Sequence, residues 1–123
     1  FNRVAQRVAT VSPDVDAKQV VEALWERERL QNTAVGLGVA IPHASLPGIT
    51  ESRLGVFTTE SPVGYRAPDG AAVDVFFVLV GPPNDRQTHL RLLSGLARLV
   101  LDKSLLERMR AATTPDELLA TME

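Results

Sequence analysis

The chain has 123 residues, of which 45% are hydrophobic and 23% charged, and its formal net charge is −2 at pH 7. This composition predicts one folded domain and excludes a disordered chain, while the small negative charge excludes the basic surface of a nucleic-acid-binding protein. Because it contains no cysteine, disulfides and thiolate metal sites are excluded, and the chain suits a reducing cytoplasm.

The N-terminal part of the chain is expected to be helical. Residues 1–9 carry apolar side chains at helical spacing and predict the remnant of a longer first helix. The chain begins at Phe1, with neither a starting Met nor a signal peptide, so we expect the native N-terminus to be missing. Ser12-Pro13-Asp14 predicts the start of a second helix that ends near Arg29, which places Arg27 in its last turn.

Three strands follow. The β-branched and aromatic residues predict them at residues 39–41, 53–59 and 73–80. The third run is apolar on both faces, so we expect it at the centre of the sheet. The longest apolar run, residues 75–80, is far shorter than the roughly 20 residues of a membrane-spanning helix. We therefore expect no insertion into a membrane.

The C-terminal third is expected to be helical again. Asn84 or Asp85 caps a helix, and two further helices are expected at residues 103–112 and 115–122. The helix that begins at this cap carries one inward stripe, formed by His89, Leu93, Leu96, Ala97 and Val100. His89 therefore lies in its first turn and points inward. Together these elements predict an α/β fold, a single compact domain with a small mixed central sheet flanked by helices.

The run Thr-Ala-Val-Gly-Leu-Gly-Val-Ala-Ile-Pro-His, from Thr33 to His43, delivers a histidine from the end of a short apolar strand. Gly36 and Gly38 let the backbone turn tightly and Pro42 fixes the approach to His43. Imidazole has an unperturbed pKa of roughly 6.5, so a neutral ring nitrogen can attack without a separate base. This points to a nucleophile. The alternative is that His43 only caps the sheet.

Several short motifs accompany His43 along the chain. They are Arg27-Glu28, Asn32-Thr33, Arg53-Leu54-Gly55-Val56-Phe57, Asp69-Gly70, His89-Leu90 and Pro115-Asp116-Glu117-Leu118. In this combination the chain resembles the enzyme IIA domain of the phosphoenolpyruvate-dependent phosphotransferase system, in its fructose, mannitol and nitrogen-regulatory branch. The resemblance extends over nearly the whole chain, and we expect one domain of this type at residues 1–123.

The resemblance implies a site for phosphoryl transfer, in which His43 accepts the phosphoryl group and His89 lies beside it. Such transfer requires alignment and stabilisation of negative charge, so we expect His89 to donate a hydrogen bond to a phosphoryl oxygen. Arg27 matches the arginine that resembles a phosphate clamp in the family, and Thr33 could offer its hydroxyl to the phosphate or to the histidine. The alternatives are a core histidine at His89, a solvated or carbonyl-paired Arg27, and turn chemistry at Thr33.

Other candidate residues carry weaker signals. Gly36 and Gly38 lack the third glycine of a phosphate-binding loop, and Ser45 follows Ala44 where many relatives have glycine. Trp25 is expected in the core. The chain has two histidines and no His-Glu-x-x-His motif, which makes a zinc site unexpected.

The resemblance implies a cytoplasmic histidine phosphocarrier without a cofactor or a metal. It would take a phosphoryl group from the histidine-containing phosphocarrier protein, or its nitrogen-type paralogue, and pass it to a IIB component in sugar uptake or use it in regulation of a target protein. The alternative is a noncatalytic regulatory or sensor module of a larger transporter or kinase-linked protein.

Overall fold

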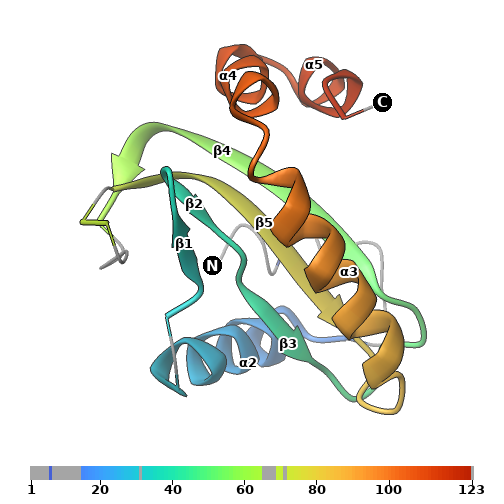
Figure 1. The fold of residues 1–123 in the computed structure, drawn as a ribbon. Coiled ribbons are helices and arrows are strands. Elements are labelled where there is room, and N and C mark those ends of the chain that lie inside the picture. Colours follow the sequence, from blue (N-terminus) through green and yellow to red (C-terminus); the bar gives the residue numbers. More distant parts are fainter. Residues whose placement is uncertain (1–5, 7–14, 31, 65–68, 71, 123) are drawn as a thin grey trace.

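The structure is a computed structural model that describes residues 6, 15–30, 32–64, 69, 70 and 72–122. These residues form one mixed sheet of five strands, with helices packed on it (Figure 1). The predicted α/β fold is therefore confirmed. The helix predicted at residues 1–9, apart from residue 6, and the helix start predicted at residues 12–14 lie outside the described residues.

The sheet is built around β5 (Val73–Gly81), as the apolar character of both its faces predicted. On one side it pairs antiparallel with β4 (Arg53–Val63). On the other side it pairs parallel with β2 (Val39–Ala40) and then with β3 (His43–Ser45). An outer strand that the sequence analysis did not predict, β1 (Ala34–Gly36), pairs antiparallel with β2.

The strand that carries the histidine is interrupted, which corrects one prediction. His43 was expected at the end of a strand over residues 39–41, but it is the first residue of β3, which follows β2 after a break at Ile41 and Pro42. Proline has no N–H to contribute to a ladder, although the Pro42 carbonyl still accepts from Leu79 N at 2.9 Å. The break thus separates two short strands that run along the same side of β5.

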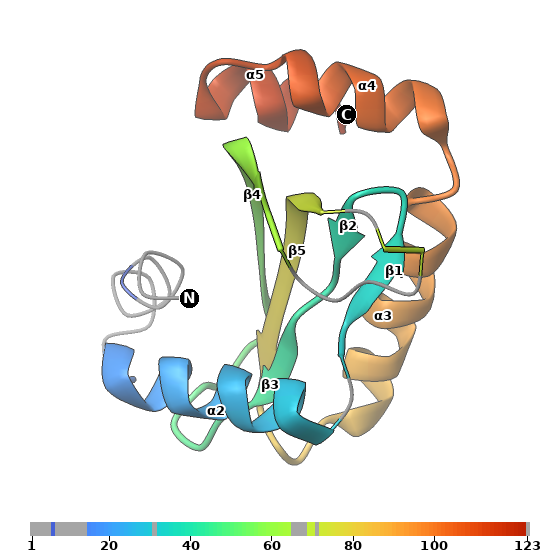
Figure 2. The ribbon, with the colours of Figure 1, turned by 90° about the vertical axis from the view of Figure 1, so that its left-hand side faces the viewer.

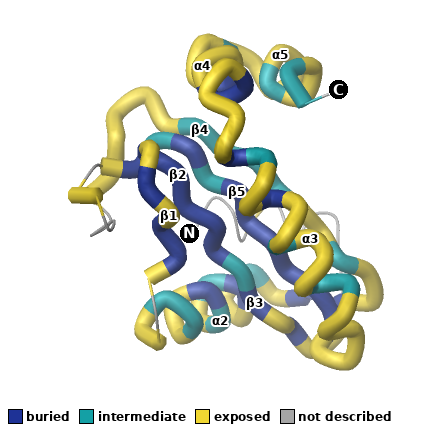
Figure 3. The backbone as a smooth tube through the Cα atoms, viewed as in Figure 1, coloured by how far each residue is buried: buried dark blue, intermediate teal, exposed yellow. Residues whose placement is uncertain are grey.

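The two faces of the sheet are covered by different helices. Val78 and Val80 of β5 pack into one core cluster with Val20 and Leu24 of α2 (Ala17–Leu30). The alternate β5 residues, Val75 and Phe77, pack into a second cluster with α3 (Arg86–Leu99) and α4 (Lys103–Ala111). Figure 3 shows β2 and β5 as the buried centre between these layers. Because successive side chains of a strand point to opposite faces of the sheet, even-numbered residues of β5 face α2 and odd-numbered residues face α3 and α4.

The helices agree with their predicted positions within a few residues. Asp85, one of the two predicted caps, accepts from Thr88 N at 3.3 Å and begins α3. Figure 2 shows α4 and α5 (Pro115–Ala120) across the end of the sheet that lies away from α2. Two details were wrong: Ala97 is exposed and does not belong to the buried stripe of α3, and Trp25 is 48% exposed and not in the core.

None of the helices in the described part of the chain is long and apolar enough to cross a membrane.

Candidate active site

His43 is held at the start of β3 by its own backbone environment. Its position along β5 is fixed by the register of the parallel pairing, in which His43 lies opposite Leu79. Its Nδ1 lies 2.8 Å from the carbonyl oxygen of Ile41. A carbonyl can only accept, so Nδ1 carries the proton. In the neutral ring this leaves the lone pair on Nε2, which is therefore the nucleophilic atom of the half-buried imidazole.

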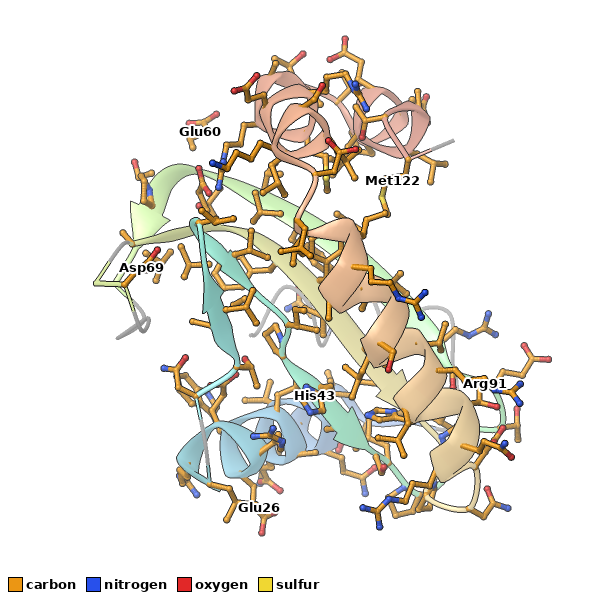
Figure 4. All side chains as sticks on the ribbon, in the orientation of Figure 1. Glu26, His43, Glu60, Asp69, Arg91 and Met122 are labelled. Carbon is orange, nitrogen blue, oxygen red and sulfur yellow. The ribbon has the colours of Figure 1, made fainter. Side chains whose placement is uncertain are left out.

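His89 approaches His43 from the first turn of α3. The two imidazole centroids are 5.6 Å apart and the rings are inclined by 53°. Leu93, Leu96 and Val100 continue the same side of α3 into the core cluster beneath, so the helix that packs on the sheet also delivers His89 to it. In Figure 4 the labelled His43 side chain lies between α2 and α3. The predicted pairing of the two histidines is thus present in the geometry.

Both imidazoles are biased toward the neutral form. Burial lowers the pKa of His43 below its ordinary value of 6.5; the Ile41 hydrogen bond opposes this, the charge of Arg27 adds to it, and the charge of Glu28 opposes it. Burial also lowers the pKa of His89, and the neighbouring His43 contributes in the same direction. Two adjacent neutral rings provide one nucleophile and one hydrogen-bond donor or acceptor.

The end of α2 brings Arg27 and Glu28 to the site. Arg27 is half-buried in the last turn, as predicted, and its guanidinium lies within electrostatic reach of the His43 ring. A fixed positive charge there favours an anion bound at His43. Thr33, the other predicted phosphate ligand, is 6% exposed, and its hydroxyl donates to Glu28 Oε1. That hydroxyl proton is consequently engaged inside the protein.

Sequence reasoning missed the residues that hold the imidazoles in place. Glu28 appeared only as the partner of Arg27 in a motif, and the carbonyl of Ile41 has no signature in a sequence. Ser52 Oγ and His89 Nδ1 are both buried without a hydrogen-bond partner among the described atoms. A Cβ on Gly81 would lie 2.9 Å from the first and 3.5 Å from the second, so both polar atoms border the same glycine.

The remaining candidates contribute no ligand to the site as it stands. Gly36 and Gly38 have φ values of +93° and +77°, so their role is the tight turn between β1 and β2. Ser45 is exposed on β3, two residues after His43. Among the described residues no group of histidine and acidic side chains could hold a metal ion.

The arrangement can therefore perform nucleophilic chemistry on an anionic group. A neutral imidazole can attack through Nε2, and the second imidazole and the guanidinium nearby could stabilise negative charge on the group that is attacked. None of these steps requires the site to supply a proton acceptor, since Nε2 already carries a lone pair.

Comparison with protein families matches all of residues 1–123 to the model described as "Phosphoenolpyruvate-dependent sugar phosphotransferase system, EIIA 2". The chain is 37% identical over 118 residues to a nitrogen regulatory protein of Pseudomonas aeruginosa, covering 96% of this chain and 77% of that protein. It is also 35% identical over 125 residues to the 2-O-α-mannosyl-D-glycerate-specific EIIABC component of Escherichia coli, covering 100% of this chain but only 19% of that protein.

Solved structures show the same architecture. The nitrogen regulatory protein IIA-Ntr of Neisseria meningitidis superposes with a TM-score of 0.92 at 33% identity, covering 100% of this chain and 84% of that one. The IIA mannitol protein of Escherichia coli shares the fold, with a TM-score of 0.70 at 21% identity and coverage of 98% and 85%.

Proposed function

Because this chain belongs to the EIIA 2 family of the phosphoenolpyruvate-dependent sugar phosphotransferase system, we propose that it is a histidine phosphocarrier with His43 as the acceptor. The observation that carries this assignment is the bond from His43 Nδ1 to the Ile41 carbonyl at 2.8 Å, beside a second imidazole. It leaves the Nε2 lone pair as the attacking electron pair.

The proposed transfer conserves atoms and electrons without a proton acceptor. The donor is a phosphohistidine of the histidine-containing phosphocarrier protein or its nitrogen-type paralogue. His43 Nε2 forms the new N–P bond, and the electron pair of the broken P–N bond returns to the donor ring. The Nδ1–H bond to Ile41 stabilises the positive charge that develops on the His43 ring, and transfer to a IIB component or a target protein runs the same step in reverse.

The other site residues stabilise the phosphoryl oxygens in this proposal. His89 donates a hydrogen bond from its ring, and Arg27 supplies positive charge from the end of α2. Thr33 can add a hydroxyl contact only if its bond to Glu28 breaks, so its contribution as a phosphate ligand is the least supported of the four. With phosphoenolpyruvate as the original phosphoryl source, the proposed location is the cytoplasm, and no cofactor or metal takes part.

The proposal is tested by phosphorylating the chain with phosphoenolpyruvate, enzyme I and the phosphocarrier protein. Wild-type protein should gain one acid-labile, base-stable phosphate, which mass spectrometry of peptides and ³¹P NMR should place on His43 Nε2. His43→Ala should abolish it. Labelling that persists in His43→Ala would exclude His43 as the acceptor.

A regulatory use of the phosphate is the second candidate, favoured by the similarity to two nitrogen regulatory proteins. In this case the phosphorylated and unphosphorylated chains should differ in affinity for a target protein by at least about 1.4 kcal/mol, which is tenfold. A transport component should instead exchange its phosphate rapidly with a IIB partner. Titration calorimetry and rapid-quench transfer assays on the same preparation separate the two uses.

A further inference from the structure

Glu28 makes a two-pronged contact with the segment that follows α2. Its Oε2 accepts from the backbone N–H of Thr33 at 3.1 Å, and its Oε1 accepts from the hydroxyl of the same residue. Thr33 is buried, so both of its donors depend on partners inside the protein. The carboxylate thereby ties the last turn of α2 to the start of the run that leads to His43.

The contact continues toward the imidazole through the backbone. The Thr33 carbonyl accepts from Ile41 N at 3.0 Å, and the Ile41 carbonyl accepts from His43 Nδ1 at 2.8 Å. Hydrogen bonds therefore link Glu28 to Thr33, Thr33 to Ile41 and Ile41 to His43, from the last turn of α2 to the start of β3. Thr33 and Ile41 each use the N–H for one bond and the C=O for the next, so the bonds hold the two peptide groups on either side of each residue.

We propose that Glu28 is a positioning residue of the phosphoryl-transfer site, which acts through Thr33 and Ile41 to hold His43 in the Nδ1–H form with Nε2 as the acceptor. A neutral imidazole has two tautomers, and its choice between them is set by the hydrogen bond that the other nitrogen makes. The inference rests on the proposed function for its catalytic consequence, but the tautomer itself is a property of the unphosphorylated protein.

This assignment also gives Thr33 a role different from that of a phosphate ligand. Its hydroxyl and its N–H both donate to Glu28, and its carbonyl accepts from the N–H of Ile41. All three polar groups of the residue are used to fix the approach to His43. The charge of Glu28 also raises the pKa of the His43 ring, against burial and the charge of Arg27, which lower it, while His43 itself lowers the pKa of His89 on α3.

Two variants of Glu28 separate the effect of its side-chain length from the effect of its charge. Glu28→Asp keeps the carboxylate but is one methylene shorter, so it cannot span both Thr33 donors from the same helix position. Glu28→Gln keeps the length and an accepting oxygen but loses the charge. Glu26→Asp, on the exposed part of the same helix and labelled in Figure 4, is the matched control.

The readout is the ¹⁵N spectrum of the His43 ring in the unphosphorylated protein, with phosphorylation rates measured alongside. We expect a single Nδ1–H species in wild type, Glu28→Gln and Glu26→Asp, and a mixture of tautomers in Glu28→Asp. The phosphorylation rate of Glu28→Asp should fall by roughly ten- to a hundredfold, because misplacement of a reacting group by about an ångström costs about a hundredfold. Glu26→Asp should keep the wild-type rate, and the rate of Glu28→Gln, which retains the reach but one accepting oxygen in place of two, should fall less than that of Glu28→Asp.

The outcomes distinguish this inference from the proposed function. A Glu28→Asp protein that keeps the Nδ1–H form as fully as wild type overturns the positioning role, whatever its rate or melting temperature. If wild-type His43 takes no phosphate, the proposed function fails, while the ring spectra still decide whether Glu28 sets the tautomer. Should Glu28→Asp not fold, Thr33→Val removes one bond of the pair and must also shift the tautomer, or the inference is rejected.

Discussion

The two imidazoles of the site differ in how their Nδ1 atoms are held. His43 Nδ1 donates to a backbone carbonyl, whereas His89 Nδ1 is buried beside Gly81 in the company of the Ser52 hydroxyl. Neither of these two buried atoms, His89 Nδ1 and Ser52 Oγ, has a hydrogen-bond partner among the described residues. The geometry therefore fixes the tautomer of His43 but not that of His89.

His89→Ala should leave His43 able to accept phosphate but slow the transfer. The substitution removes one transition-state hydrogen bond, which is worth roughly 2 to 4 kcal/mol or about 30- to 1,000-fold in rate. His89→Gln retains a donor and should recover part of that loss. Rapid-quench measurement of both transfer steps tests this, and a His89→Ala protein with wild-type rates but a lower melting temperature would make His89 a core histidine.

Gly81→Ala should displace the buried Ser52 hydroxyl that lies near His89. The new Cβ would lie 2.9 Å from Ser52 Oγ and 3.5 Å from His89 Nδ1, so the serine must move, at a cost of about 1 kcal/mol or more in the free energy of unfolding. The 3.5 Å approach to His89 Nδ1 is an ordinary van der Waals contact, so the transfer rate should stay near that of wild type. Denaturant unfolding and transfer rates measure the two effects, and adding Ser52→Ala should restore the stability.

The control for this substitution is Gly95→Ala in α3, where a Cβ meets nothing within 4 Å. Because alanine favours a helix over glycine, it should raise the free energy of unfolding by about 0.5 to 1 kcal/mol. Equal losses of stability at both glycines would show that the close approach at Gly81 is not the cause.

At the scale of elements, the turn between β1 and β2 is tied to α4. Leu37 has a φ of +59°, between two glycines that are also in the left-handed region. Arg110 of α4 donates from Nε to Asp74 at 3.0 Å and from Nη2 to the Leu37 carbonyl, while Asp69 accepts from Leu37 N. One arginine therefore fixes a strained turn at the end of the sheet remote from α2.

Arg110→Ala should lower the free energy of unfolding by about 1 to 2 kcal/mol, because it removes charge-assisted bonds from a partly buried pair. Arg108→Ala, on the same helix with one exposed bond to Ser104, should change it by less than about 0.5 kcal/mol. Urea unfolding of the two variants tests the difference. Phosphorylation rates should match wild type in both, and a loss of transfer in Arg110→Ala would contradict a purely structural role.

Periodicity was sufficient to predict the long elements and a central sheet flanked by helices. The apolar run of β5 and the helices over α2, α3 and α4 appear where the pattern indicated. Of the short strands, β2 was predicted within residues 39–41, whereas β1 and β3 were missed, because each has only three residues and is defined by its pairing with another strand. Trp25 was wrongly predicted to be buried, because tryptophan is usually buried but this position on α2 faces the solvent.

The candidate site was also predicted only in part: the residue types were found, but not the contacts that orient them. Side-chain types in a family motif indicated His43, His89 and Arg27, and the fold brings the two rings together. The atoms that choose the tautomer of His43 are a backbone carbonyl and a carboxylate acting through Thr33. Such contacts depend on backbone direction rather than residue type, so a single sequence carries no pattern for them.

At the scale of the whole molecule, the site couples stability to pH. The pKa values of His43 and His89 are both lowered from 6.5, chiefly by burial. Below that value the unfolded chain binds protons that the folded chain does not. The free energy of unfolding therefore rises with pH in the range below about 6.5, and the contribution of the two neutral histidines is complete above that range. Protonation of the two adjacent rings should destabilise the fold as the pH falls.

Urea unfolding from about pH 8 down to about pH 5.5 should show this loss below about pH 6.5, with a slope of at most about 1.4 kcal/mol per pH unit for each histidine. Solvent reaches both half-buried rings, so the measured slope should be smaller than that limit. His43→Ala with His89→Ala should flatten the profile, while Arg110→Ala should lower it uniformly and keep its shape. A double-histidine variant with the wild-type slope would show that other groups bind the protons.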